Sequence, residues 1–161
     1  MIIQYLRQLI IIFVVNHINE SKFMSTLTIP STFTVRYAET DPMGIVHHKN
    51  YITYLEEGRS EYARQRGFPY SQFEASGFFL LVTEVHIRHI KPARYEQSIT
   101  VNTWIAEMKS RGMTFAYTVV DTLTGEILAT AETKHICITK AGQIAKIPQI
   151  WHDWHTPDSD K

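Results

Sequence analysis

The sequence lacks several features that would indicate particular classes of protein. Sixteen basic residues balance sixteen acidic ones. No block of like charge occurs, so nothing indicates a nucleic-acid partner. The single cysteine, Cys137, excludes an intrachain disulfide and a cysteine-rich metal site. This cysteine usage fits the reducing cytoplasm, where we expect the protein to work. Cys137 lies in an alternating run, so we expect it to be a buried structural thiol.

The sequence also lacks an apolar run long enough to cross a membrane. Residues Leu9–Val15 are apolar, but a spanning helix needs roughly 20 such residues, so we expect no stable membrane insertion. No small-residue cleavage site follows this run, which argues against a secretion signal. We interpret residues 1–30 as an extra N-terminal segment and favour Met24 as the native start. The second interpretation is that an amphipathic segment is appended to the domain. One domain is expected over 31–150 and a C-terminal tail over 151–161.

One long helix is predicted between Asn50 as its N-cap and Gly67 as its stop. Apolar residues recur there at the helical spacing i, i+3, i+4, i+7 and i+11. The face that they form consists of Tyr51, Tyr54, Leu55, Gly58 and Tyr62. We expect this face to be core, with Tyr51 also able to contact a ligand and Gly58 allowing another element to approach closely. A second, short helical turn is expected at Ser71–Glu74, whose spacing matches a capping box.

The remaining chain is rich in β-formers. Alternation predicts strands over 32–37, 79–90, 97–109, 113–121 and 126–139, with tight turns between the last three. A strand, a long helix and four long strands in that order predict an α+β fold. The sheet would be antiparallel, strongly curved and wrapped around one central helix. Its outer face would need a partner, so we expect an oligomer.

The stretch RYAETDPMGIVHHKNYITYLEEGR, followed by these strands, resembles the hotdog-fold acyl-CoA thioesterases. The resemblance is to the 4-hydroxybenzoyl-CoA thioesterase-like group and the Tol-Pal-linked short acyl-CoA thioesterases, and it covers residues 32–148. A second stretch, IKPARYEQSITVNTWI, resembles a strand entry of the same group. Residues at the signature positions are Glu39, Asp41, Gly44, Val46, His47, His48, Tyr51, Glu57 and Arg59. Glu39 stands where an Asp is commoner in the group.

The resemblance implies hydrolysis of an acyl-CoA, or of an acyl carrier protein thioester, without a cofactor. Asp41 takes the catalytic position, and His48 the position whose backbone N–H faces the thioester carbonyl. Members are dimers or tetramers with active sites at subunit interfaces, so a homodimer or homotetramer is implied. The substrate-binding set is Gly44, Val46, Tyr51, Glu57, Lys109 and Arg111, the last two as cations for the CoA phosphates. Lys91 and Arg94 are a second candidate pair of cations.

The chemistry of thioester hydrolysis explains why these residue types suit the site. The reaction needs a group that attacks or activates water and a group that stabilises the oxyanion. Pro42 restricts the backbone of Asp41, and Gly44 permits backbone conformations closed to other residues. The following helix offers unpaired N–H groups and its positive dipole end to a carbonyl oxygen. Asp41 as nucleophile and Asp41 as general base both fit the sequence.

The same residues are compatible with three other functions, each of which the sequence disfavours. A hotdog hydratase or dehydratase would carry His-Phe-Pro or Asp-x-Asn-x-x-His stretches, which the sequence lacks. A non-catalytic acyl-binding protein would not need a carboxylate at Asp41. A metal site is disfavoured because adjacent residues such as His47 and His48 rarely reach one ion. His47 is therefore interpreted as a bystander.

Overall fold

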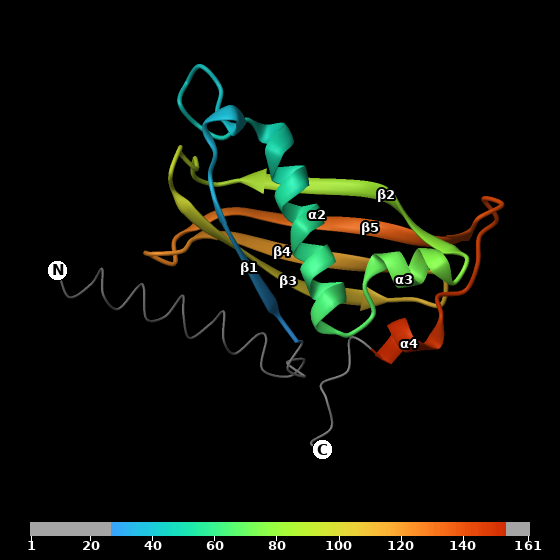
Figure 1. Ribbon diagram of the computed structural model, residues 1–161. Helices are drawn as coiled ribbons and strands as arrows, with labels where there is room; N and C mark the ends of the chain where they lie inside the picture. Colours follow the sequence, from blue (N-terminus) through green and yellow to red (C-terminus); the bar gives the residue numbers. More distant parts are fainter. Residues whose placement is uncertain (1–26, 154–161) are drawn as a thin grey trace, which may run out of the picture.

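The computed structural model describes residues 27–153, so the predicted start at Met24 and the tail beyond 153 lie outside the described residues. Five strands form one antiparallel sheet in the order β1-β3-β4-β5-β2 (Figure 1). Their bounds are Ile29–Thr34 for β1, Phe78–His89 for β2, Ser98–Met108 for β3, Gly112–Asp121 for β4 and Ile127–Thr139 for β5. The predicted α+β hotdog arrangement of a sheet and one long helix is confirmed.

The first strand differs from its prediction, whereas the bounds of the other four are met to within one residue. Strand β1 ends at Thr34, and the Val35 N–H makes a last bond to the Gln97 carbonyl at 3.0 Å. Residues Tyr37–Glu39, expected to begin within the strand, form a 3-10 helix. The cause is local, because the Glu39 carboxylate accepts the backbone N–H of Arg36 at 2.8 Å and turns the chain out of the sheet.

Helix α2, His48–Gln65, crosses the inner face of the sheet and lies closest to β1 and β3 (Figure 1). The predicted apolar face is confirmed, since its buried residues are Tyr51, Tyr54, Leu55, Gly58, Tyr62 and Ala63. Gly58 permits this approach, because a Cβ there would lie 2.7 Å from the Thr103 hydroxyl. The predicted stop is also found, as Gly67 adopts φ +77° just after the helix.

The predicted N-cap of α2 is wrong. His47 occupies that position, and its Nδ1 accepts the Lys49 N–H at 3.3 Å. Asn50 lies inside the first turn, and its side-chain amide donates to the Glu39 carbonyl at 2.6 Å. His47 is therefore part of the helix start and not a bystander in the fold.

Two short helices close the far end of the sheet. Helix α3, Tyr70–Ala75, packs on β2 and confirms the short helical turn predicted at Ser71–Glu74. Its N-cap is Pro69, so the predicted capping box at Ser71 does not form. Helix α4, Gln149–His152, places the fully buried Trp151 against Phe73, with ring centroids 4.4 Å apart. The core thus includes Trp151, the residue at which the C-terminal tail is predicted to begin.

Cys137 is fully buried on β5, as predicted. Burial raises the pKa of its thiol and keeps it in the neutral form. Neither α2 nor any shorter helix within residues 27–153 combines the length and the apolar character that a bilayer crossing requires.

Candidate active site

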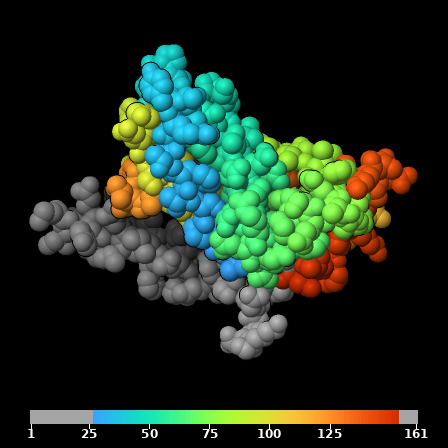
Figure 2. Space-filling view, viewed as in Figure 1, coloured from blue at the N-terminus to red at the C-terminus, as the bar shows by residue number. Residues whose placement is uncertain are grey.

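The segment that leads into α2 is a small hairpin that projects from one end of the molecule (Figure 2). Its turn is closed by the Gly44 N–H, which donates to the Asp41 carbonyl at 2.9 Å, and the Asp41 N–H donates to the Ile45 carbonyl at 2.9 Å. Gly44 has φ +71°, a left-handed conformation that glycine adopts without strain. Asp41 Oδ1 accepts the Met43 N–H at 2.9 Å, so the side chain is oriented by its own turn.

The hairpin is held in place on the chain that links β2 and β3. The Val46 N–H donates to the Ala93 carbonyl at 2.9 Å, and Ile45 forms an isolated antiparallel bridge with Arg94. Val46 is 5% exposed, so it fixes the base of the hairpin to the core. The tip with Asp41 stays at the surface, where a substrate can reach it.

Helix α2 begins directly after this hairpin. His48 is its first residue, so its backbone N–H has no acceptor within the helix. The imidazole rings of His47 and His48 stack with centroids 4.1 Å apart, and the His48 side chain is exposed. The helix dipole places partial positive charge here, which favours an oxygen that gains negative charge.

Asp41 and the start of α2 line one pocket of about 360 Å³. Four of the predicted site residues meet there, namely Asp41, Val46, His48 and Tyr51. Burial raises the pKa of Tyr51, whose phenol therefore stays neutral. Gly44 shapes the same hairpin and does not line the pocket. Half-buried Asp41 is thus placed beside the donor end of a helix, on an open surface cavity.

Residues that sequence reasoning did not assign to the site complete this pocket. His89 at the end of β2 contacts Tyr51 edge-to-face, with ring centroids 4.6 Å apart. Pro92 and Lys91 also line the pocket, and Lys91 is paired with Glu126. No local pattern marks His89, because only the antiparallel return of β2 brings it beside α2. Lys91 belongs to the second candidate pair of phosphate-binding cations and lies in the reacting pocket instead.

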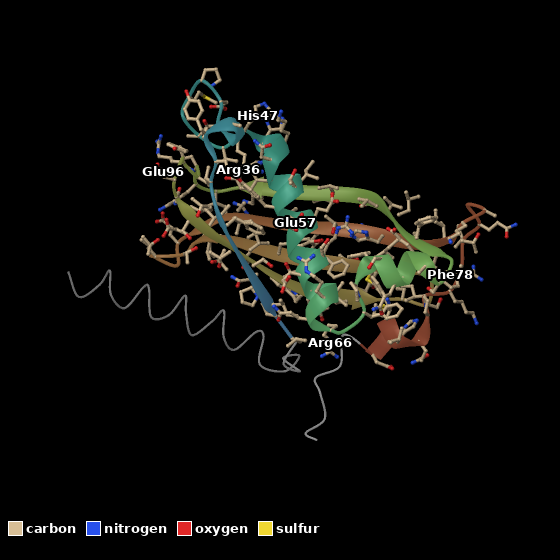
Figure 3. All side chains as sticks on the ribbon, viewed as in Figure 1. Arg36, His47, Glu57, Arg66, Phe78 and Glu96 are labelled. Carbon is tan, nitrogen blue, oxygen red and sulfur yellow. The ribbon has the colours of Figure 1, made fainter. Side chains whose placement is uncertain are left out.

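Three predicted substrate-binding residues lie elsewhere in the chain. Glu57 is exposed on α2, 3.9 Å from Arg64 and beside β1 (Figure 3). Lys109 and Arg111 line a separate cavity of about 430 Å³ that includes Thr83 of β2. Thr83 and His89, one lining residue of each cavity, are six residues apart on β2 and so lie about 20 Å from each other.

The described part of the chain, residues 27–153, contains no group of three His, Cys, Asp or Glu side chains arranged to hold a metal ion. The polar groups that line the pocket are the Asp41 carboxylate, the imidazoles of His48 and His89, the Tyr51 phenol, the paired Lys91 ammonium and the first N–H groups of α2. This set suits attack on, and polarisation of, a carbonyl.

The family model of the thioesterase-like superfamily matches residues 35–154. The chain belongs to this superfamily. The Bacillus subtilis (strain 168) protein YneP, whose name assigns it provisionally to the acyl-CoA thioesterases, is 36% identical over 76% of this chain and 88% of its own length. The acyl-CoA thioester hydrolase YbgC of Escherichia coli O157:H7 is 26% identical over 65% of this chain and 77% of its own.

Solved structures agree with this superfamily assignment. The DHNA-CoA thioesterase of Staphylococcus aureus superposes with a TM-score of 0.74 at 29% identity, covering 80% of this chain and 86% of that one. The resemblance inferred from the hairpin and helix sequence is thus confirmed for both family and fold.

Proposed function

We propose that this thioesterase-superfamily protein hydrolyses acyl-CoA thioesters to a free acid and CoA. The observation that carries the proposal is the shared pocket, in which the Asp41 carboxylate and the N-terminus of α2 face the same space. Relatives named as acyl-CoA thioester hydrolase and DHNA-CoA thioesterase support the substrate class. The single cysteine, buried and free, supports a cytoplasmic location.

In the proposed reaction the thioester oxygen lies against the first N–H groups of α2, including that of His48. Asp41 acts as a general base that takes a proton from water, whose oxygen attacks the carbonyl carbon, or as a nucleophile that forms a mixed anhydride with the acyl group. In either route the C–S bond breaks and CoA leaves as a thiolate that takes up a proton. In the nucleophilic route, water then attacks the acyl carbonyl of the anhydride and releases the Asp41 carboxylate, so in both routes water supplies the second oxygen of the acid. The helix end stabilises the oxyanion in both routes.

A second copy of the chain would bring the proposed phosphate site to the reacting site. Within one copy, Lys109 and Arg111 line a cavity separate from the Asp41 pocket, and Thr83 and His89, one lining residue of each, are about 20 Å apart along β2. Antiparallel pairing of two β2 edges about a twofold axis would set the Thr83 half of one strand toward the His89 half of the other. We therefore propose a homodimer, or a homotetramer built from it, in which Lys109 and Arg111 bind the CoA phosphates from the partner. Glu57 is not carried into this site, because it lies beside β1.

Thiol release from benzoyl-, naphthoyl-, short- and long-chain acyl-CoAs tests the activity and ranks the acyl groups. Asp41→Asn keeps the shape of the side chain and removes its charge, so we expect turnover to fall by about a thousandfold. His48→Ala retains the backbone N–H and should lose no more than about tenfold. Glu74→Gln, an exposed carboxylate on α3, is the matched control. Full turnover in Asp41→Asn on every substrate would refute the assignment of Asp41.

Mixed oligomers test the proposed sharing of the site. One chain carries Asp41→Asn, and the other carries Lys109→Ala with Arg111→Ala. If the cations come from the partner, each hybrid dimer holds one intact site, and random mixing restores about a quarter of wild-type activity at low substrate concentration. If both groups serve the same chain's site, mixing restores nothing, and the proposed arrangement is wrong.

A further inference from the structure

We propose that Glu39 is a positioning residue, which holds the Asp41 hairpin against the start of α2 so that carboxylate and helix donors face one pocket. This inference rests on the proposed thioesterase function and gives a role to an acid that does not itself line the pocket. The juxtaposition that points to it is one buried carboxylate joined to the chain on both sides of the hairpin.

Glu39 is 6% exposed as a residue, and both of its carboxylate oxygens accept hydrogen bonds. Oε1 accepts from the Arg36 guanidinium, at 2.9 Å from Nε and 2.6 Å from Nη2. Oε2 accepts the Arg36 backbone N–H at 2.8 Å and the Tyr54 hydroxyl at 2.7 Å. A single carboxylate thus ties the chain before the hairpin to the second turn of α2.

The main chain of the same residue holds the other side of the hairpin. The Glu39 carbonyl accepts the His47 N–H at 2.9 Å and the Asn50 side-chain amide at 2.6 Å. His47 is the N-cap of α2, so this bond sets where the helix begins relative to Asp41. Figure 3 shows Arg36 and His47 at this same end of α2.

The charge of Glu39 is part of this arrangement. Burial alone would raise the pKa of the carboxyl, but the hydrogen bonds from Arg36 and Tyr54 outweigh it and hold the pKa below its ordinary value. Burial, together with the hydrogen bond to Glu39, raises the pKa of Tyr54, which keeps its proton as a donor. A neutral or shorter side chain cannot satisfy both partners, so the hairpin would gain freedom to move relative to the helix.

Positioning and stability roles predict different kinetics. At a temperature where all variants are folded, Glu39→Gln should lower kcat by about tenfold or more with little change in KM, because displacements near 1 Å already cost about a hundredfold in oriented reactions. Glu39→Asp, which keeps the charge but is shorter, should fall between Glu39→Gln and wild type. Tyr54→Phe removes one bond and should show a smaller loss of kcat.

Hydrogen exchange supplies a readout that does not depend on activity. The His47 and Val46 amides should exchange faster in Glu39→Gln and in Tyr54→Phe, while amides of β4 stay unchanged. Phe73→Leu, a core substitution at the opposite end, is the matched control, with a lower Tm but unchanged kcat and unchanged His47 exchange.

Each outcome decides the proposal. Wild-type kcat and wild-type His47 exchange in Glu39→Gln would overturn it. If Glu39→Gln does not fold, Tyr54→Phe decides, and unchanged His47 exchange there overturns the inference. If wild-type protein releases no thiol from any acyl-CoA, the proposed function fails, and the exchange experiment still tests the anchoring role of Glu39 alone.

Discussion

The two edges of the sheet differ in length, composition and cover. Strand β1 has six residues, begins with Ile29 and Pro30, and contacts α2. Its exposed residues alternate with buried or half-buried ones. Strand β2 has twelve residues, and its side chains are mostly exposed although the strand is rich in apolar residues. Its exposed apolar residues include Leu81 at 49% and Val85 at 38%.

The difference indicates which edge of the sheet is protected against pairing with another strand and which edge is available for it. Short strands and proline are features that prevent edge-to-edge pairing, and β1 has both. Among residues 27–153, β2 pairs with β5 alone and forms the outer edge of the sheet, and a long apolar edge of this kind invites another strand. The contrast therefore assigns the proposed oligomer contact to β2, beside His89 and the Asp41 pocket.

The largest effect is expected from a charge on the open edge. Leu81→Lys places one ammonium from each copy near the proposed contact, so the dissociation constant of the oligomer should rise by at least about a hundredfold. Thr34→Lys, on the β1 edge, is the matched control and should leave assembly intact. Sedimentation velocity over a concentration series measures both. Dissociation by the β1 variant and not by the β2 variant would reverse the comparison.

A smaller effect is expected from acid, on the β2 side of the sheet. His135 on β5 faces Val82 of β2 in the register, is 2% exposed, and bonds the Thr133 hydroxyl at 2.7 Å through Nε2. Burial, with a contribution from the Arg59 charge, lowers its pKa from 6.5 to about 3. Between these values the unfolded chain binds a proton that the folded protein does not.

The free energy of unfolding should therefore fall as the pH drops from 6.5 toward 3, by at most about 1.4 kcal/mol per pH unit from this group. His135→Gln should flatten that slope, whereas His86→Gln, an exposed histidine on β2, should not. Denaturant titrations at several pH values measure the slope. As the pH falls, we also expect the amides of β2 to lose protection against hydrogen exchange before those of β1. The opposite order would show that acid does not act on the β2 side first.

The smallest effect, on stability, is expected where α2 packs against β3, next to the β1 edge. Gly58→Ala would place its Cβ 2.7 Å from Thr103 Oγ1 and 3.0 Å from Val101 Cγ1. Overpacking should outweigh the better helix propensity of alanine, with a net loss of about 1–2 kcal/mol in unfolding free energy. Thr103→Ala in the same chain removes the closest atom and should recover part of the loss, as a double-mutant cycle will show. A more stable Gly58→Ala protein would show that the contact of α2 with β3 has room for a methyl group.

Features set by local sequence could be predicted. The face of α2 follows from side-chain periodicity, and the bounds of four of the five strands follow from their runs of β-forming residues between turns. The family and the meeting of Asp41 with His48 follow from residues close together in the chain. The end of β1 was missed because the alternation continues past Thr34, while the bend depends on Glu39 bonding back to Arg36.

Features set by contacts between distant residues could not be predicted. The N-cap was assigned to Asn50 because asparagine favours that position, but the Glu39 carbonyl occupies its amide. The proposed anchoring role of Glu39 depends on its hydrogen bond with Tyr54, which is 15 residues away in the chain and outside the signature positions. The distance of Lys109 and Arg111 from Asp41 depends on strand order, about which the sequence of a basic turn carries no information.

The burial of Cys137 has a practical consequence for enzymology. It is the only cysteine in the chain, and its side chain is fully enclosed. Dyes that react with thiols should leave the folded protein unlabelled, so colour that develops with an acyl-CoA reports the released CoA directly. The same dye should react once per chain after denaturation, which gives an internal standard for enzyme concentration and a direct count of unfolded molecules in every variant assayed.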